Sequence, residues 1–263
     1  MSVDSPDILF LRRLADAAAQ ETMKYFRSNL AVDNKYKVGF DPVTEGDRRA
    51  EAAIRAILDA ECPNHGILGE EFGAKNTDKK CVWVIDPIDG TRAYLAGVPV
   101  WGTLVGLMVD GHAKYGFLDQ PYTREFYVAD GKQTYLIEAD RPAKILSTRQ
   151  TAALKDAIIF TTSPFLFKGL EREGIDRLEA KCKLMRYGTD CYGAAMVASG
   201  HADIFIESGL KPYDIAALIP LIEQAGGIIS RVDGKRPEEG GTHIGGGFEE
   251  ALYEEALHVF LGA

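Results

Sequence analysis

Apolar residues near the N-terminus recur at intervals of three and four, the spacing that gathers them on one face of an α-helix. A first amphipathic helix is predicted from Ser5-Pro6, where a capping serine precedes a proline at the first helical position, to about Asn29. A second helix is predicted over residues 47–61, and residues 41–46 between the two indicate a loop or a short strand. The chain therefore opens with two amphipathic helices.

From residue 82 onward the apolar positions follow the pattern of β-strands. The dipeptides Asp110-Gly111 and Asp130-Gly131 are typical of the tight turns that join the strands of hairpins. Strands are predicted over residues 82–85, 104–109, 114–118, 125–129 and 134–137. An antiparallel meander is therefore expected to follow the two helices.

The second half of the chain alternates strand-like and helix-like segments, which indicates an α/β arrangement. Strands over residues 157–161, 184–187, 203–206 and 228–230 are predicted to alternate with helices over 175–181, 192–199 and 212–225. The glycine-rich residues 240–247 are expected to form a loop before a last helix over 249–261. We expect one domain over residues 1–263, with lobes of about 1–140 and 141–263 that meet near Arg141-Pro142.

Composition narrows the classes of function. The chain has 263 residues, 46% of them hydrophobic, which is enough to bury a large core. Its 39 acidic and 30 basic residues give a net charge of −9 without a Lys/Arg cluster, so a nucleic-acid partner is not expected. The four cysteines are scattered, and neither a leader sequence nor an 18-residue apolar stretch occurs, so we expect a reducing, cytoplasmic location and no membrane association.

The most informative motif is Asp86-Pro87-Ile88-Asp89-Gly90-Thr91, which follows the apolar run at residues 82–85. A predicted strand here delivers two carboxylates and a backbone carbonyl into a tight turn. Proline fixes its own backbone angle, glycine permits a conformation that other residues resist, and the threonine is placed to begin a helix. Oxygen ligands beside exposed amide groups suit the binding of a phosphate together with divalent cations.

Further acidic residues stand at the ends of predicted elements: Asp47, the pair Glu70-Glu71, and Asp214. Taken singly, each has an ordinary explanation as a helix cap or a surface charge. Gathering several carboxylates in one place is unfavourable unless cations neutralise them, and ligands that are all oxygen favour Mg²⁺ or Mn²⁺ over zinc. The combination predicts a site for hard divalent cations.

Together these motifs resemble the inositol monophosphatase superfamily. The resemblance rests on residues 86–91, preceded by Gly69-Glu70-Glu71 and followed by Asp214 within residues 213–217, with residues 43–47 similar to the family's early Asp motif. It covers residues 8 to 261 and implies a sandwich of alternating helix and sheet layers (αβαβα, of mixed α+β and α/β character) in two lobes. It also implies a Mg²⁺-dependent phosphatase of small phosphomonoesters, inhibited by Li⁺ and Ca²⁺ and assembled as a homodimer.

The same resemblance implies roles for individual residues. Glu70, Asp86 and the Ile88 carbonyl would hold a first Mg²⁺, and Asp86, Asp89 and Asp214 a second, with a third, weaker ion near Glu70; Mn²⁺ is an alternative metal. Asp47 and Thr91 would orient and help to deprotonate the attacking water, so that Asp47, Glu70 and Thr91 form the expected catalytic set. The amides of Gly90 and Thr91 would bind the phosphate at a helix N-terminus.

Residues that depart from the inositol pattern suggest the histidinol-phosphate phosphatase branch. These are the runs at residues 91–94, 97–104, 187–192 and 210–214. Histidinol phosphate carries an ammonium and an imidazole, so Asp190 and Glu207 are expected to accept hydrogen bonds from it; a helix N-cap is the alternative role for Asp190, and the two roles are compatible. Arg92 and Arg186 are expected to contact substrate or to form structural ion pairs, and reaching across a subunit interface is a further alternative for Arg186.

The expected reaction is therefore hydrolysis of histidinol phosphate to histidinol and phosphate, a step of histidine biosynthesis. Inositol 1-phosphate, or a broad range of small esters, is the alternative substrate. A metal-binding relative without catalytic activity is the alternative of another class.

Overall fold

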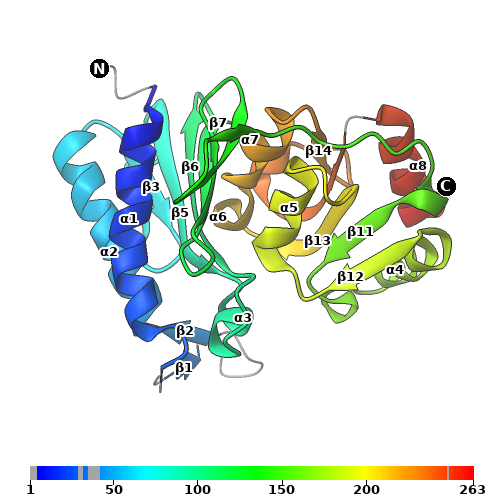
Figure 1. The fold of residues 1–263 in the computed structure, drawn as a ribbon, viewed down its shortest axis with the longest axis horizontal. Helices are drawn as coiled ribbons and strands as arrows, with labels where there is room; N and C mark the ends of the chain where they lie inside the picture. The colour runs from blue at the N-terminus through cyan, green and yellow to red at the C-terminus, as the bar shows by residue number, and fades with distance from the viewer. Residues whose placement is uncertain (1–4, 29–31, 35–41, 248) are drawn as a thin grey trace.

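The computed structural model describes residues 5–28, 32–34, 42–247 and 249–263. Five layers follow one another across the molecule, two sheets alternating with three layers of helix (Figure 1). Helices α1 (Ile8–Tyr25) and α2 (Glu45–Glu61) cover the outer face of the first sheet. The expected αβαβα sandwich is confirmed. Among the described helices, none is both long enough and apolar enough to span a bilayer.

The first sheet has eight strands in the order β10-β9-β8-β7-β6-β5-β3-β4. Its pairings are antiparallel except that between β3 and β5, so the predicted meander is confirmed. Residues 144 and 145 of β10 extend this sheet beyond Arg141-Pro142. The strands are β3 (Gly66–Gly69), β4 (Gly73–Lys75), β5 (Cys81–Asp89), β6 (Gly102–Val109), β7 (His112–Gln120), β8 (Glu125–Ala129), β9 (Thr134–Glu138) and β10 (Lys144–Ile145).

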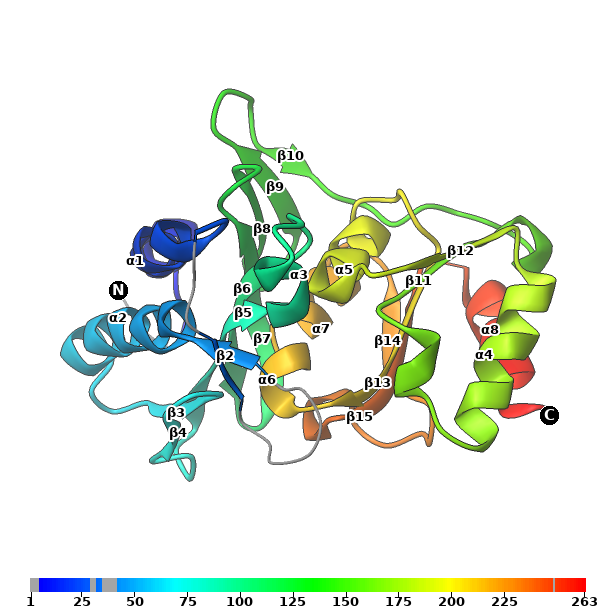
Figure 2. The ribbon, with the colours of Figure 1, turned by 90° about the horizontal axis from the view of Figure 1, so that it is seen from below.

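Helices α5 (Asp190–Ala198), α6 (Pro212–Ile215) and α7 (Leu218–Glu223) lie between the two sheets (Figure 2). Gly116 of β7 lets this layer approach closely, because a Cβ there would lie 2.7 Å from the carbonyl oxygen of Ala217. Ala217 lies directly before α7, so the close approach brings the start of α7 against β7 of the first sheet.

The second sheet has five strands in the order β12-β11-β13-β15-β14. Helices α4 (Leu170–Lys181) and α8 (Glu250–Leu261) cover its outer face (Figure 2). Its strands are β11 (Ile158–Thr161), β12 (Leu184–Tyr187), β13 (Ile204–Leu210), β14 (Ile228–Arg231) and β15 (Gly241–Gly246). Short elements complete the described chain: β1 (Val32–Asn34), β2 (Pro42–Thr44), α3 (Thr91–Leu95) and the 3₁₀ turns η1 (Leu154–Asp156), η2 (Pro164–Leu166) and η3 (Pro237–Glu239).

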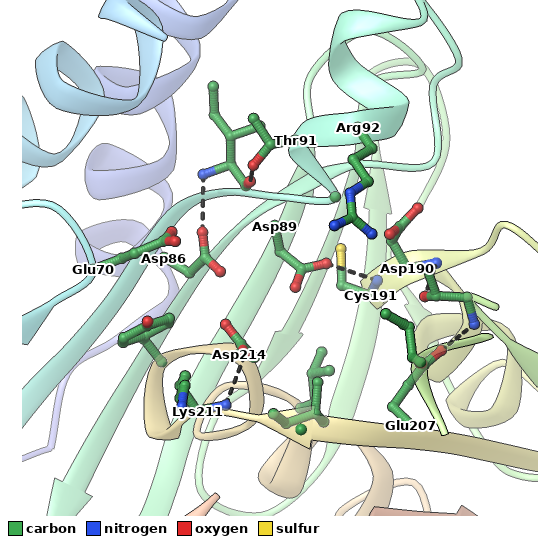
Figure 3. Close-up of a pocket in the computed structure, with 18 of the residues that line it drawn as sticks. Glu70, Asp86, Asp89, Thr91, Arg92, Asp190, Cys191, Glu207, Lys211 and Asp214 are labelled. Carbon is green, nitrogen blue, oxygen red and sulfur yellow. Dashed lines mark hydrogen bonds between the residues drawn. The ribbon is translucent and has the colours of Figure 1, made fainter. Parts of the chain in front are cut away.

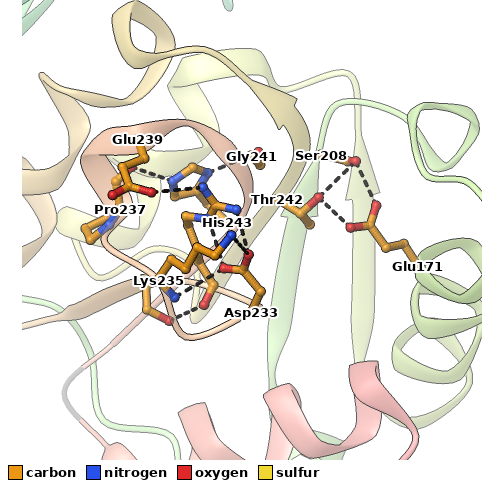
Figure 4. A network of polar contacts seen from close by, with 11 residues as sticks. Glu171, Ser208, Asp233, Lys235, Pro237, Glu239, Gly241, Thr242 and His243 are labelled. Atoms are coloured by element: carbon orange, nitrogen blue, oxygen red, sulfur yellow. Dashed lines mark hydrogen bonds and ion pairs between the residues drawn. The ribbon is translucent and has the colours of Figure 1, made fainter.

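The expectation of a loop over residues 240–247 is wrong, because β15 pairs on both sides, with β13 and with β14. Its glycines are required by packing: a Cβ at Gly245 would lie 2.9 Å from Ile222, and one at Gly246 would lie 2.8 Å from Tyr253. Side-chain contacts also fix the strand, since Thr242 donates to Glu171 of α4 at 2.6 Å and His243 contacts the Pro237 carbonyl at 2.6 Å (Figure 4).

Three helix predictions are wrong in their bounds, and one of them is the helix predicted over residues 175–181, which begins at Leu170. Asp7 caps α1 by accepting from the Phe10 amide at 2.8 Å, so the helix begins after Pro6 rather than at it. It ends at Tyr25, and the predicted limit at residue 29 lies outside the described residues. The single helix expected over 212–225 is two helices, because Pro220 has no N–H to donate to the carbonyl four residues earlier.

Candidate active site

Four of the acidic residues singled out in the sequence, Glu70, Asp86, Asp89 and Asp214, line one cavity of about 470 Å³ (Figure 3). Asp86 and Asp89 come from the end of β5 and Asp214 from α6. One carboxylate oxygen of each lies within 4.8 Å of the others. Glu70, in the turn after β3, lines the same cavity and lies close enough to Asp86 to affect its ionisation. Segments about 125 residues apart therefore place carboxylates face to face.

The end of β5 is shaped by the sequence of its turn. The pairing of β5 with β6 shifts between Asp86 and Asp89, and the Thr103 hydroxyl donates to the Pro87 carbonyl at 2.8 Å inside this irregularity. The Ile88 amide donates to Asp86 Oδ1 at 3.1 Å. These bonds fix the two carboxylates on the cavity side of the strand.

Gly90 then starts α3 with a left-handed φ of +81°. A side chain at this position would be strained, and its Cβ would lie 3.0 Å from Asp190 and 3.2 Å from Trp101. The Thr91 hydroxyl donates to the Ile88 carbonyl at 3.1 Å. The order of strand, glycine and helix is as predicted, but β5 continues to Asp89, so residues 86–89 lie in the strand and not in the tight turn predicted for them.

Backbone amides at helix starts also hold the carboxylates of Asp89 and Asp214. The Cys191 amide, in the first turn of α5, donates to Asp89 Oδ1 at 2.8 Å. Asp214 is the third residue of α6 after Pro212, as predicted, and its Oδ2 accepts from the Lys211 amide at 2.7 Å. Both contacts place a negative charge where the partial positive charge of a helix start favours it.

Burial and mutual repulsion nevertheless oppose ionisation of these groups. Burial first, and then the charges of Glu70, Asp89 and Asp214, raise the pKa of Asp86. Burial, followed by the charges of Asp214 and Asp190, raises the pKa of Asp89. Burial raises the pKa of Asp214 to about 7. A site that keeps its acids under such repulsion is suited to a bound cation, which reverses the sign of the local field.

The donor chemistry fits Mg²⁺ or a similar hard cation. The facing ligands are carboxylate oxygens, and no histidine is among the residues that line the cavity. One cysteine lines it, but burial raises the pKa of the Cys191 thiol, which disfavours the thiolate that a softer metal would select.

Asp47 lies beside the cavity and is not among the residues that line it. It is buried in the first turn of α2, where its Oδ2 accepts from the amide and the hydroxyl of Thr44 at 2.8 and 2.6 Å. Burial raises its pKa to about 7, and the nearby charges of Glu71 and Glu70 contribute. Its catalytic role remains a prediction.

Asp190 and Glu207 line the cavity opposite Asp86 (Figure 3). The Thr162 segment joins them, because the Thr162 amide donates to Glu207 Oε1 and the Asp190 amide donates to the Thr162 hydroxyl at 3.1 Å. Burial raises the pKa of Glu207, and it raises that of Asp190 to about 6 against the opposing effect of Arg92. Asp190 is not the N-cap of α5: Thr189 is, and Asp190 has a left-handed φ of 45°.

The two arginines differ in position. Arg92 lines the cavity, whereas Arg186 is exposed on β12 and is not among the lining residues. The cavity is also lined by residues to which no role was assigned from the sequence: Thr162, Leu166, Cys191, Phe205, Ser208, Gly209, Leu210, Lys211, Tyr213 and Leu218. The runs that contain Cys191, Lys211 and Tyr213 are among those singled out in the sequence. No sequence signal indicated Thr162, whose contact with Glu207 is made by its backbone amide.

A model of the inositol monophosphatase family matches residues 4–259. The chain therefore belongs to the inositol monophosphatase family, and it is a phosphatase of the type that is typically magnesium-dependent and acts on small phosphorylated substrates.

The relatives carry more than one name. The chain is 42% identical over 226 residues to the bifunctional phosphatase IMPL2 of the Arabidopsis thaliana chloroplast, covering 85% of this chain but 63% of that protein. It is 35% identical over 224 residues to a histidinol-phosphatase of Chlorobaculum parvum, covering 85% of each. A solved inositol monophosphatase from Zymomonas mobilis is 37% identical, with a TM-score of 0.86 over 99% of both chains.

Proposed function

We propose that this chain hydrolyses histidinol phosphate to histidinol and phosphate, a step of histidine biosynthesis in the cytoplasm. The observation that carries the proposal is the second pair of acids, Asp190 and Glu207, in the same cavity as the cluster of Asp86, Asp89 and Asp214. The similarity to histidinol-phosphatases, such as that of Chlorobaculum parvum, supports the same substrate.

Two or three Mg²⁺ ions, or Mn²⁺ in their place, are proposed to bind to residues 70, 86, 88, 89 and 214. Glu70 and the Ile88 carbonyl complete the ligands that Asp86, Asp89 and Asp214 supply. Bound there, such ions lower the pKa of water and neutralise charge that develops on the leaving oxygen. Li⁺ and Ca²⁺ are expected to inhibit by occupying these positions without supplying the same chemistry.

The chain's own groups orient the reaction. The amides of Gly90 and Thr91, at the start of α3, donate to phosphoryl oxygens. The Thr91 hydroxyl already points to the Ile88 carbonyl, which places it beside the ligand group, where it and Asp47 orient the attacking water.

Substrate choice is proposed to rest on charge. The ammonium and imidazole of histidinol can each donate to Asp190 and Glu207, whereas a neutral inositol ring gains less from two acids, one buried (Glu207) and one half-buried (Asp190). Arg92 lies near Asp190 and is proposed to orient that carboxylate or to contact substrate.

The test compares phosphate release from histidinol phosphate and from inositol 1-phosphate, with Mg²⁺ and with EDTA. We expect a strong preference for histidinol phosphate and no turnover in EDTA. In Asp190→Asn the KM for histidinol phosphate should rise about 10-fold or more, as expected for the loss of one charged contact. The KM for inositol 1-phosphate should change little.

Equal rates of phosphate release from the two esters would overturn the proposed substrate but not the phosphatase activity. Such a result would favour inositol 1-phosphate or broad specificity, which the Zymomonas mobilis relative supports. Mg²⁺ binding without turnover of either ester would favour a silent relative.

A homodimer is also proposed. Arg186 is exposed on β12, so in a dimer it could contact the partner chain rather than its own cavity. Sedimentation of the wild type and of Arg186→Ala tests this: a monomeric wild type would refute the dimer.

A further inference from the structure

The turn that carries Glu70 is held by hydrogen bonds to a carboxylate that does not line the cavity. Glu51 of α2 has a side chain that is 0% exposed and does not line the cavity. Its Oε2 accepts from the Glu71 amide at 2.7 Å, and its Oε1 accepts from the Phe72 amide at 3.2 Å. The two backbone amides that follow Glu70 therefore donate hydrogen bonds to one buried carboxylate.

Arg55, one helical turn further along α2, completes the arrangement. Its Nε donates to Glu51 Oε1 at 2.7 Å, and its Nη2 donates to the Gly73 carbonyl on the far side of the same turn. The Glu51–Arg55 pair thus holds both ends of residues 71–73.

The sequence around the turn is fitted to this pair. A Cβ at Gly69 would overlap the Glu51 carboxyl group, so only glycine lets the strand pass so close to it. On its other side the Glu70 amide donates to the Ile85 carbonyl of β5 at 3.1 Å, next to Asp86. Glu70 therefore sits between two fixed backbone contacts, one toward α2 and one toward β5.

We propose that Glu51 is a positioning residue for the metal site: it holds the Glu70 carboxylate at the distance from Asp86 that the cations require. This inference rests on the proposed function, since it assigns a cation ligand to Glu70. Outer groups that orient a metal ligand commonly change metal affinity by about 10- to 100-fold when they are replaced.

Asp203→Asn is the matched control. Asp203 is also buried, and it accepts from Arg149 at 2.6 Å and from the Ile158 amide at 2.6 Å. It does not line the cavity, so its replacement weakens the fold in the same chemical way without moving Glu70.

The experiment measures Mn²⁺ binding to the metal-free protein by electron paramagnetic resonance, with urea unfolding in EDTA as a parallel readout. Glu51→Gln replaces one acceptor oxygen with a donor and must lose at least one of the bonds to residues 71, 72 and Arg55. We expect its Mn²⁺ Kd to rise about 10- to 100-fold. The Kd of Asp203→Asn should stay within about twofold of wild type at a similar loss of stability.

Arg55→Met provides a second variant if Glu51→Gln does not fold, and its Kd should also rise, because Glu51 and the Gly73 carbonyl both lose a partner. An unchanged Kd in the folded Glu51 or Arg55 variant would overturn the inference, as would an equal rise in Asp203→Asn. The variant Asp89→Asn distinguishes failure of the proposed metal site from failure of the role of Glu51. If the wild type binds Mn²⁺ no better than Asp89→Asn, the proposed metal site is overturned, and the role of Glu51 with it.

Discussion

Neutralising Asp47 should stabilise the metal-free protein while it abolishes activity. Asp47 is 1% exposed, and its burial raises the pKa from 3.8 to about 7. Asparagine has the same shape and can still accept from the Thr44 amide and hydroxyl through its oxygen. The substitution Asp47→Asn therefore removes a charge and keeps the cap of α2.

The sign follows from the direction of the pKa shift. Because the folded chain holds this proton more tightly than the unfolded chain, raising the pH from about 4 to 7 destabilises the folded state of the wild type. A shift of roughly three pH units corresponds to at most about 4 kcal/mol. Asp47→Asn lacks this penalty, so its advantage in free energy of unfolding should be near zero at pH 3.5 and on the order of 2 to 4 kcal/mol at pH 8.

Urea unfolding in EDTA across this pH range measures the difference in free energy of unfolding between wild type and Asp47→Asn. Titratable groups that the two proteins share contribute equally to both and cancel in this difference. Asp119→Asn is the control, since Asp119 is 3% exposed, lies outside the cavity and has its pKa raised to about 7 by burial. It should gain stability in the same pH window and keep its phosphatase activity. Equal stability of wild type and Asp47→Asn at pH 8 would refute the reasoning.

Two glycine substitutions test the geometry around the site. Gly90→Ala should lose activity and about 1–3 kcal/mol of stability by urea unfolding, because it forces φ of +81° on a side chain that also meets Asp190. Gly188→Ala, with φ of +74° and open space around its Cβ, should lose only about 1 kcal/mol, so equal losses would contradict the steric part. Gly116→Ala should lower the thermal midpoint by separating β7 from Ala217, and an unchanged midpoint would show that the layers can move apart freely.

Much of the site could be predicted because its chemistry is local. Residues 86–91 carry two ligands, a fixed proline and a glycine that must turn, so their order alone indicates their conformation. The gathering of Asp86 and Asp214 across the fold came from the family resemblance, since nothing in spacing shows which distant segments meet.

What could not be predicted depended on tertiary packing. The glycines of β15 carry no strand signal, because they are chosen for the space left by Ile222 and Tyr253. The role of Glu51 was equally hidden, since its partners are backbone amides 20 and 21 residues away and a helix glutamate resembles any surface charge. Asp190 matched a helix cap in sequence, but the chain turns one residue earlier, at Thr189.

The most direct test of the central claim is anomalous diffraction from crystals soaked in Mn²⁺. The account predicts Mn²⁺ peaks in the cavity at about 2.0–2.3 Å from carboxylate oxygens of Asp86, Asp89 and Asp214, with Glu70 as a further ligand. Well-ordered crystals with no Mn²⁺ among these carboxylates, or with Mn²⁺ bound only elsewhere, would contradict it.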